Sequence, residues 1–197
     1  MTTLVFLLEE PSAREMLDGV MQRLMPQMTD IRFVVFEGKQ DMMHGLERKL
    51  RGWLAPDTRF VVFRDQDSAD CHDVKQALVE ICRRAGRPDA LTRVACRELE
   101  SFYLGDLAAV EHGLELNGLA TRQDGRKYRS PDGLNNAKEE LIRLTGGHYQ
   151  ERAGSRSIAR HLRIDGANRS RSFNVLLAGI QRLTRGATGA DGQVIGE

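Results

Sequence analysis

Short runs rich in apolar residues recur four times along the first half of the chain, and the fourth, at residues 91–96, is the weakest. They are rich in Val, Leu and Phe, and each run ends abruptly in polar residues. Runs of this length and kind are typical of strands that are buried on both faces of a parallel sheet. We therefore expect strands at residues 4–8, 31–36, 60–63 and 91–96.

Each run is followed by a segment in which apolar residues recur at helical spacing. We expect these helices at residues 13–25, 41–53, 70–84 and 102–110. Strand and helix alternate four times, which predicts βαβ units with right-handed crossovers. The predicted fold class is α/β, with a mostly parallel sheet of about four strands flanked by helices.

The pattern changes beyond Gly113. Residues 118–133 read as a basic loop, and helical spacing then recurs at residues 136–145, 157–162 and 172–183. The last residues are rich in Gly, Ala and Thr, which is typical of a fraying tail. We divide the chain into an α/β domain (1–112), a basic helical extension (113–185) and a flexible tail (186–197).

The overall net charge of +1 hides an asymmetry between the two parts of the chain. Residues 1–117 carry 15 Lys and Arg against 20 Asp and Glu, a net charge of −5, whereas residues 118–197 carry 14 against 8, a net charge of +6. A basic, arginine-rich segment suggests contact with phosphate, although solvated arginine faces are at least as common.

Composition also narrows the cellular setting. No apolar run approaches the roughly 20 residues that a membrane-spanning helix needs, and the first apolar run has no basic segment before it. We therefore expect no membrane partner and no signal peptide. The 3 cysteines are odd in number and lack Cys-x-x-Cys spacing, so a reducing, cytoplasmic location fits best.

Acidic residues follow the predicted strands. Glu9 comes after the first strand, Asp65 and Asp67 after the third, and Glu98 and Glu100 after the fourth. Because parallel strands bring their carboxyl ends to one edge of a sheet, we expect these carboxylates to converge. Anionic oxygen ligands suit a hard cation, so the pattern predicts a site for Mg²⁺ or Mn²⁺.

The same acids also have a simpler interpretation. Acidic and serine side chains are common after strands because they cap the next helix, and Ser68 or Asp70 suits that role. The carboxylates can instead pair with Arg14, Arg64 or Arg97. Both interpretations remain open at this stage.

The order of these acids resembles the Toprim domain of topoisomerases, primases and OLD-type nucleases. Residues 8–17 look like its first motif, with Glu9 at the glutamate position, and Asp65-Gln66-Asp67 matches its Asp-x-Asp motif. Residues 97–106 are similar to a block in an uncharacterised bacterial Toprim-related family. The resemblance covers roughly residues 1–112 and continues more weakly to residue 185. Glu10 departs from the glycine of most Toprim domains, and Ala13 from an acid that many have.

The resemblance implies a magnesium-dependent, nuclease-like enzyme that cleaves phosphodiester bonds, acting with an ATPase partner in phage defence. In that family Glu9 would be the general acid or base, and Asp65, Asp67 and one of Glu98 or Glu100 would bind the metal. One alternative is a catalytically inactive Toprim-like interaction module. Another is a haloacid-dehalogenase-type phosphatase, because residues 65–69 resemble its Asp-x-Asp motif, although that motif normally follows the first strand.

A row of arginines marks the basic extension. A helix through Arg163 would align four of them on one face, with Ser155 and Ser157 capping its start. Such a row can track the phosphate backbone of DNA or RNA, and the alternative is a solvated helix paired with the acidic front domain. The predicted nucleic-acid-binding residues are Arg152, Arg156, Arg160, Arg163, Arg169 and Arg171.

Overall fold

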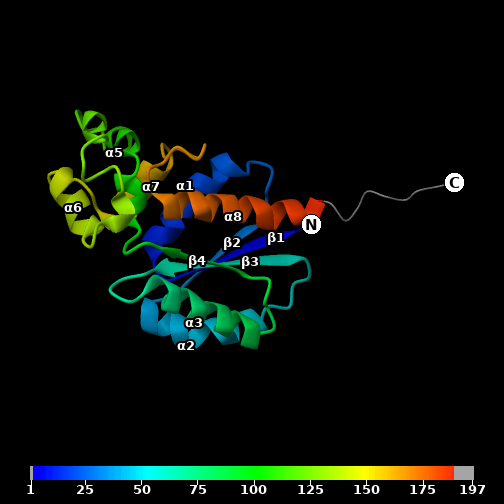
Figure 1. Ribbon diagram of the computed structural model, residues 1–197. Coiled ribbons are helices and arrows are strands. Elements are labelled where there is room, and N and C mark those ends of the chain that lie inside the picture. The colour runs from blue at the N-terminus through cyan, green and yellow to red at the C-terminus, as the bar shows by residue number, and fades with distance from the viewer. Residues whose placement is uncertain (1, 189–197) are drawn as a thin grey trace.

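The computed structural model describes residues 2–188, and a four-stranded, all-parallel sheet lies at its centre (Figure 1). Its strand order is β2-β1-β3-β4, so β1 and β3 are the inner strands. All 6 residues of β1 are buried, as a continuous apolar run predicts. The α/β class and the parallel sheet are confirmed. The strands are β1 (Thr3–Leu8), β2 (Ile31–Val35), β3 (Thr58–Asp65) and β4 (Leu91–Ala95).

Helices cover both faces of the sheet. Figure 1 shows α2 and α3 below it and α1 and α8 above it. Alternate residues of β1 point to the two layers: Val5 and Leu7 pack with α2 and α3, whereas Phe6 packs with α1 and the later helices. Among the described residues, no helix has the length and apolar character that a membrane crossing requires. The helices of the first half are α1 (Pro11–Leu24), α2 (Lys39–Arg51), α3 (Cys71–Arg84), α4 (Glu100–Leu104) and α5 (Leu107–Gly113).

The predicted extension shares the core of the α/β part. Helix α7 packs against α1 and α5, α6 packs against α4, and α8 runs along β4. Leu141, Ile158 and Phe173 are fully buried in the same apolar cluster as Phe6 of β1. This half of the chain therefore builds a wall of the sheet's own core. Its elements are two short 3-10 helices (Ala120–Arg122 and Pro131–Gly133), α6 (Ala137–Leu144), α7 (Glu151–Ala159) and α8 (Arg171–Thr188).

The largest differences from the sequence prediction concern three of the expected helices. The single helix expected at 102–110 is two helices, because helical structure is interrupted between Leu104 and Leu107. The carboxylate of Asp106 caps the second helix, α5, by accepting a hydrogen bond from the Ala109 N–H. The helix expected at 157–162 begins at Glu151 and ends at Ala159, so Ser155 lies inside it and caps nothing. Helix α8 continues to Thr188, beyond the predicted end at 183, and the rest of the predicted tail (189–197) lies outside the described residues.

Candidate functional site

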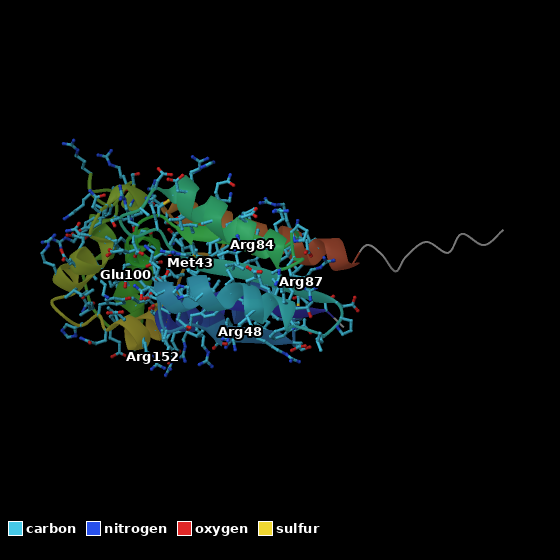
Figure 2. The ribbon with its side chains drawn as sticks, turned by 90° about the horizontal axis from the view of Figure 1, so that it is seen from below. Met43, Arg48, Arg84, Arg87, Glu100 and Arg152 are labelled. Atoms are coloured by element: carbon cyan, nitrogen blue, oxygen red, sulfur yellow. The ribbon has the colours of Figure 1, made fainter. Side chains whose placement is uncertain are left out.

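The acidic edge comprises the carboxylates after β1, β3 and β4, namely Glu9, Glu10, Asp65, Asp67, Glu98 and Glu100. Each strand ends at the same edge because the sheet is all-parallel. Figure 2 shows Glu100 at the same end of the molecule as Arg152 of α7, whereas Arg84 and Arg87 lie further along the α3 side. The helices of the second half therefore close over this edge.

A buried arginine, Arg64 of β3, joins two of the predicted site residues. Its side chain is only 3% exposed. The guanidinium Nε lies 3.2 Å from Glu9 Oε2, and an Nη donates to Asp67 Oδ2 at 3.0 Å. Lys39 approaches the same Asp67 oxygen at 3.8 Å. Pairing with Arg64, which the sequence left as an alternative for these acids, is therefore present for Glu9 and Asp67.

Asp65 lies deeper than Asp67. Its Oδ2 accepts a hydrogen bond from the Leu99 backbone N–H at 3.1 Å. Burial raises the pKa of Asp65 well above its ordinary value, and repulsion from Glu10, Glu100 and Glu9 raises it further. Asp65 is thus close enough to carboxylates from two other strand ends for their charges to act on it.

The neighbouring carboxyl groups show the same effect. Burial raises the pKa of Glu9 despite the nearby Arg64, and burial together with Glu151 and Asp67 raises the pKa of Glu10 despite a hydrogen bond from the Ser12 hydroxyl. Raised pKa values on adjacent groups mean that burial first, and repulsion between the carboxylates second, disfavour ionising all of them together.

Glu100 is the most buried of these acids. It is 3% exposed, and the Tyr149 hydroxyl donates to its Oε1 at 2.8 Å. Burial raises the pKa of Glu100 to about 7, with further contributions from Glu10 and Glu98. This carboxyl group therefore changes charge near neutral pH, the range in which proton transfer is most useful.

Glu98 has a different role. Its Oε2 accepts a hydrogen bond from the Lys138 backbone N–H at 2.8 Å, in the first turn of α6. The side chain therefore caps a helix, which is the simpler interpretation that the sequence allowed for these acids. Of the two acids that follow β4, Glu100 is the one that faces the other carboxylates.

The two loops that carry these acids are held together by the backbone. The Asp67 N–H donates to the Arg97 carbonyl at 2.9 Å, and both residues have positive φ, 58° and 65°. Aspartate tolerates this left-handed conformation better than arginine does, and such outliers cluster at functional sites. This backbone conformation holds Asp67 on the solvent side of the acidic edge, where 42% of its side chain is exposed.

The carboxylate oxygens at this edge are hard donors, the kind of ligand that Mg²⁺ and Mn²⁺ prefer. Glu9 Oε2 is buried and accepts no hydrogen bond from any residue that the structure describes, so it retains a free lone pair. Within residues 2–188, however, no three His, Cys, Asp or Glu side chains stand ready as a set of metal ligands. A bound cation would have to draw the carboxylates together or displace Arg64.

The arginine row does not form one face. Arg152 and Arg156 lie on α7 and both approach Glu15 of α1, at 3.8 and 2.7 Å. Arg160 only ends the helix, and Arg163 lies beyond it, where its guanidinium pairs with Asp165. The predicted helix through Arg163 is therefore wrong, because α7 stops at Ala159.

Arg169 and Arg171 also point to different places. Arg169 pairs with Asp124 at 3.1 Å, whereas Arg171 begins α8 and lines a separate hollow beside β4. For Arg152 and Arg156 the structure shows the pairing with the acidic front of the molecule that the sequence left as an alternative.

Several residues of the edge carried no sequence signal. Tyr149 and Tyr103 are fully buried next to the acids. Lys138 of α6 is close enough to Glu100 and Glu10 for their negative charges to raise its pKa. Tyr149 and Lys138 come from segments that are far from the strand ends in sequence, so only the fold brings them to this edge. Arg64, in contrast, is a partner that the sequence already offers, because an arginine within an apolar strand is unusual.

The fold and the site define a class: a three-layer α/β protein with a parallel sheet and a carboxylate cluster at its carboxyl edge. More specifically, the chain belongs to the family described as a domain of unknown function, DUF4276, which matches residues 8–181. No curated protein and no solved structure matches the chain significantly.

Proposed function

We propose that this protein binds Mg²⁺ or Mn²⁺ at its acidic edge and hydrolyses phosphodiester bonds of DNA or RNA. The observation that carries the proposal is the convergence of carboxylates from the ends of β1, β3 and β4, which are close enough to repel one another. Glu9, Glu10, Asp65 and Glu100 all have raised pKa values, although Arg64 lies beside one of them. A divalent cation would relieve that repulsion.

Roles follow from where the side chains lie. Asp67 is accessible, Asp65 is fixed by the Leu99 N–H, and Glu9 has a lone pair without a hydrogen bond, so these three would hold the cation. The cation would supply Lewis-acid polarisation of a phosphoryl oxygen. Glu9 would act as general acid or base only while the two aspartates alone hold the cation, because its raised pKa then allows it to carry a proton. These roles agree with the resemblance to Toprim domains, which also suggests an ATPase partner and phage defence.

A second function is favoured by a specific observation. Arg64 already places a positive charge between Glu9 and Asp67, where a metal would otherwise sit. With that pair in place the edge is a purely structural ion-pair cluster, and the protein is a catalytically inactive interaction module. The two functions differ in whether a divalent cation binds at all.

Thermal unfolding with and without Mg²⁺ or Mn²⁺ separates them. A ligand that binds only the native state stabilises it, so we expect either ion at about ten times its dissociation constant to raise the melting temperature by about 3 °C. Asp67→Asn should remove most of that rise and any hydrolysis of DNA or RNA. Asparagine tolerates positive φ, so the fold is kept.

The matched control is Glu80→Gln, which removes an acid of α3 that pairs only with Arg83 on the surface. Its response to metal should equal that of the unaltered protein. No shift with either ion up to about 10 mM would contradict metal binding and favour the inactive module.

A further inference from the structure

A second polar hollow, which we call the Gly105 pocket, lies where α4 gives way to α5. Its volume is about 740 Å³, within the range of roughly 300–1,000 Å³ that small-molecule sites occupy. None of the carboxylates of the acidic edge lines it. The polar residues around it are Asp106, Gln123, Asp124, Arg129, Arg163, Asn168 and Arg169.

The loop of residues 118–133 forms one wall and is held firmly by Gln123. The Gln123 Oε1 accepts from the Leu107 N–H at 2.6 Å, and its Nε2 donates to the carbonyls of Leu104 and Tyr128 at 3.2 and 3.0 Å. The hydrogen-bonding groups of this amide are therefore occupied in joining the loop to the α4–α5 junction. This wall of the pocket is fixed without a ligand.

The opposite wall, residues 163–170, is fixed to the same junction. The Arg169 N–H donates to the Gly105 carbonyl at 2.9 Å, and buried Asn168 donates to the Phe102 carbonyl and accepts from the Ser170 N–H. A Cβ atom on Gly105 would lie 2.1 Å from Asn168 Oδ1, so only glycine permits this approach. The pocket is thus built by buried polar residues on both sides.

Positive charge dominates what remains available to a ligand. Both carboxylate oxygens of Asp106 are occupied, one by the Ala109 N–H and the other by the Arg163 N–H. Arg163 and Arg169 hold only exposed pairs, with Asp165 and Asp124, and such surface pairs contribute little stability.

Arg129 differs from these two arginines. Its exposed guanidinium makes no hydrogen bond or ion pair with any residue in the described part of the chain. It is therefore free to bind a ligand without giving up an existing contact. The pocket offers guanidinium donors and no unsatisfied amide, so it suits recognition by charge and not by base identity.

We propose that the Gly105 pocket binds a phosphate group, carried either by a free nucleotide or by a polynucleotide, through Arg129, Arg163 and Arg169. Guanidinium groups bind phosphate oxygens through paired, charge-assisted hydrogen bonds, which is why arginine is preferred for phosphate recognition. The proposal goes beyond hydrolysis at the acidic edge, because it requires neither a metal nor cleavage.

Isothermal titration in a metal-free buffer containing EDTA tests it, with pyrophosphate, a nucleoside diphosphate and a single-stranded oligonucleotide as probes. Arg129→Ala should weaken binding of at least one probe about tenfold, the loss expected for hydrogen bonds to a charged group. The control is Arg126→Ala, which removes the same charge from the same loop outside the pocket and should change affinity by less than about twofold.

The probes distinguish the source of the phosphate. Loss confined to pyrophosphate and the diphosphate assigns the pocket to a free nucleotide, and loss confined to the oligonucleotide assigns it to a polynucleotide. Equal losses for Arg126→Ala and Arg129→Ala, or no binding of any probe, would overturn the proposal. The titration is made in EDTA and reports on this pocket, whereas the response of the melting temperature to Mn²⁺ reports on the acidic edge, so failure of the metal site and failure of this pocket are told apart.

Discussion

At the scale of single residues, Arg64 is central to the acidic edge. A buried arginine that contacts two carboxylates is costly to desolvate, and its pairs keep it in place. In the folded protein it is the internal substitute for part of the positive charge that a cation would bring. Its position makes Arg64 the residue whose replacement best separates structure from metal binding.

Arg64→Gln should destabilise the metal-free protein by about 3 kcal/mol, because it leaves Glu9 and Asp67 without their partner. If the edge binds a cation, Mn²⁺ should then stabilise this variant more than it stabilises the unaltered protein, since the competing guanidinium is gone. Chemical denaturation with and without Mn²⁺ measures both effects. Equal or smaller stabilisation of the variant would show that Arg64 does not occupy a cation's place.

A second residue-scale prediction concerns Glu100 and pH. Its pKa in the folded protein is raised from 4.5 to about 7, so the folded state holds more protons between these values. Stability from this group is therefore present below pH 4.5 and is lost as pH rises through 7, by up to about 3 kcal/mol.

Glu100→Gln removes this titration while keeping an acceptor for the Tyr149 hydroxyl. Relative to the unaltered protein, we expect the variant to gain stability between pH 5 and pH 8, measured by denaturant unfolding. Glu139→Gln, on the exposed face of α6, should follow the unaltered protein at every pH. A constant difference between Glu100→Gln and the unaltered protein across this range would contradict the raised pKa.

At the scale of elements, close backbone contacts decide how α5, α7 and α1 pack. Gly113 ends α5 directly against α7, and a Cβ atom there would lie 2.7 Å from Ile158 Cα. Gly19 of α1 meets α7 in the same way, at 2.9 Å from the Ala159 Cβ. These contacts bring α7 onto the sheet's core, so residues 113–185 contribute to the stability of the whole fold.

Gly113→Ala should therefore destabilise the protein by about 1–3 kcal/mol, because α5 or α7 must shift to admit one methyl group. The control is Gly133→Ala, where an added Cβ meets nothing within 4 Å. Urea unfolding of both variants measures the difference. A Gly113→Ala protein as stable as the control would mean that the two helices do not depend on this approach.

The same elements show what the sequence predicts and what it does not. Continuous apolar runs predict the inner strands β1 and β3 because burial on both faces leaves a strong local signal, whereas the edge strands β2 and β4 are less buried and leave a weaker one. The start of α7 was missed because Gln150 is no typical capping residue, whereas Ser155 resembles one and is in fact buried. The start of α7 is therefore set by packing against residues distant in sequence, and the local capping signal at Ser155 does not determine it.

At the scale of the whole molecule, parallel topology brings the acids to one edge, and this much follows from the sequence. What the sequence does not contain is the second half's closure over that edge. Glu15 meets Arg156 across 141 positions, and Tyr149 meets Glu100 across 49, so neither partner is visible in local patterns. Between the acidic and the basic half, Arg152 and Arg156 both pair with Glu15, whereas Arg143, Arg163 and Arg169 pair within the basic half.

The central claim is that a divalent cation binds where Glu9, Asp65 and Asp67 meet. The most direct measurement is anomalous scattering from crystals soaked in Mn²⁺. We predict a peak within about 2.6 Å of oxygens from Glu9 and at least one of the two aspartates, with Arg64 withdrawn from Glu9. Crystals that show no anomalous peak at this edge, with Arg64 still between Glu9 and Asp67, would contradict the claim.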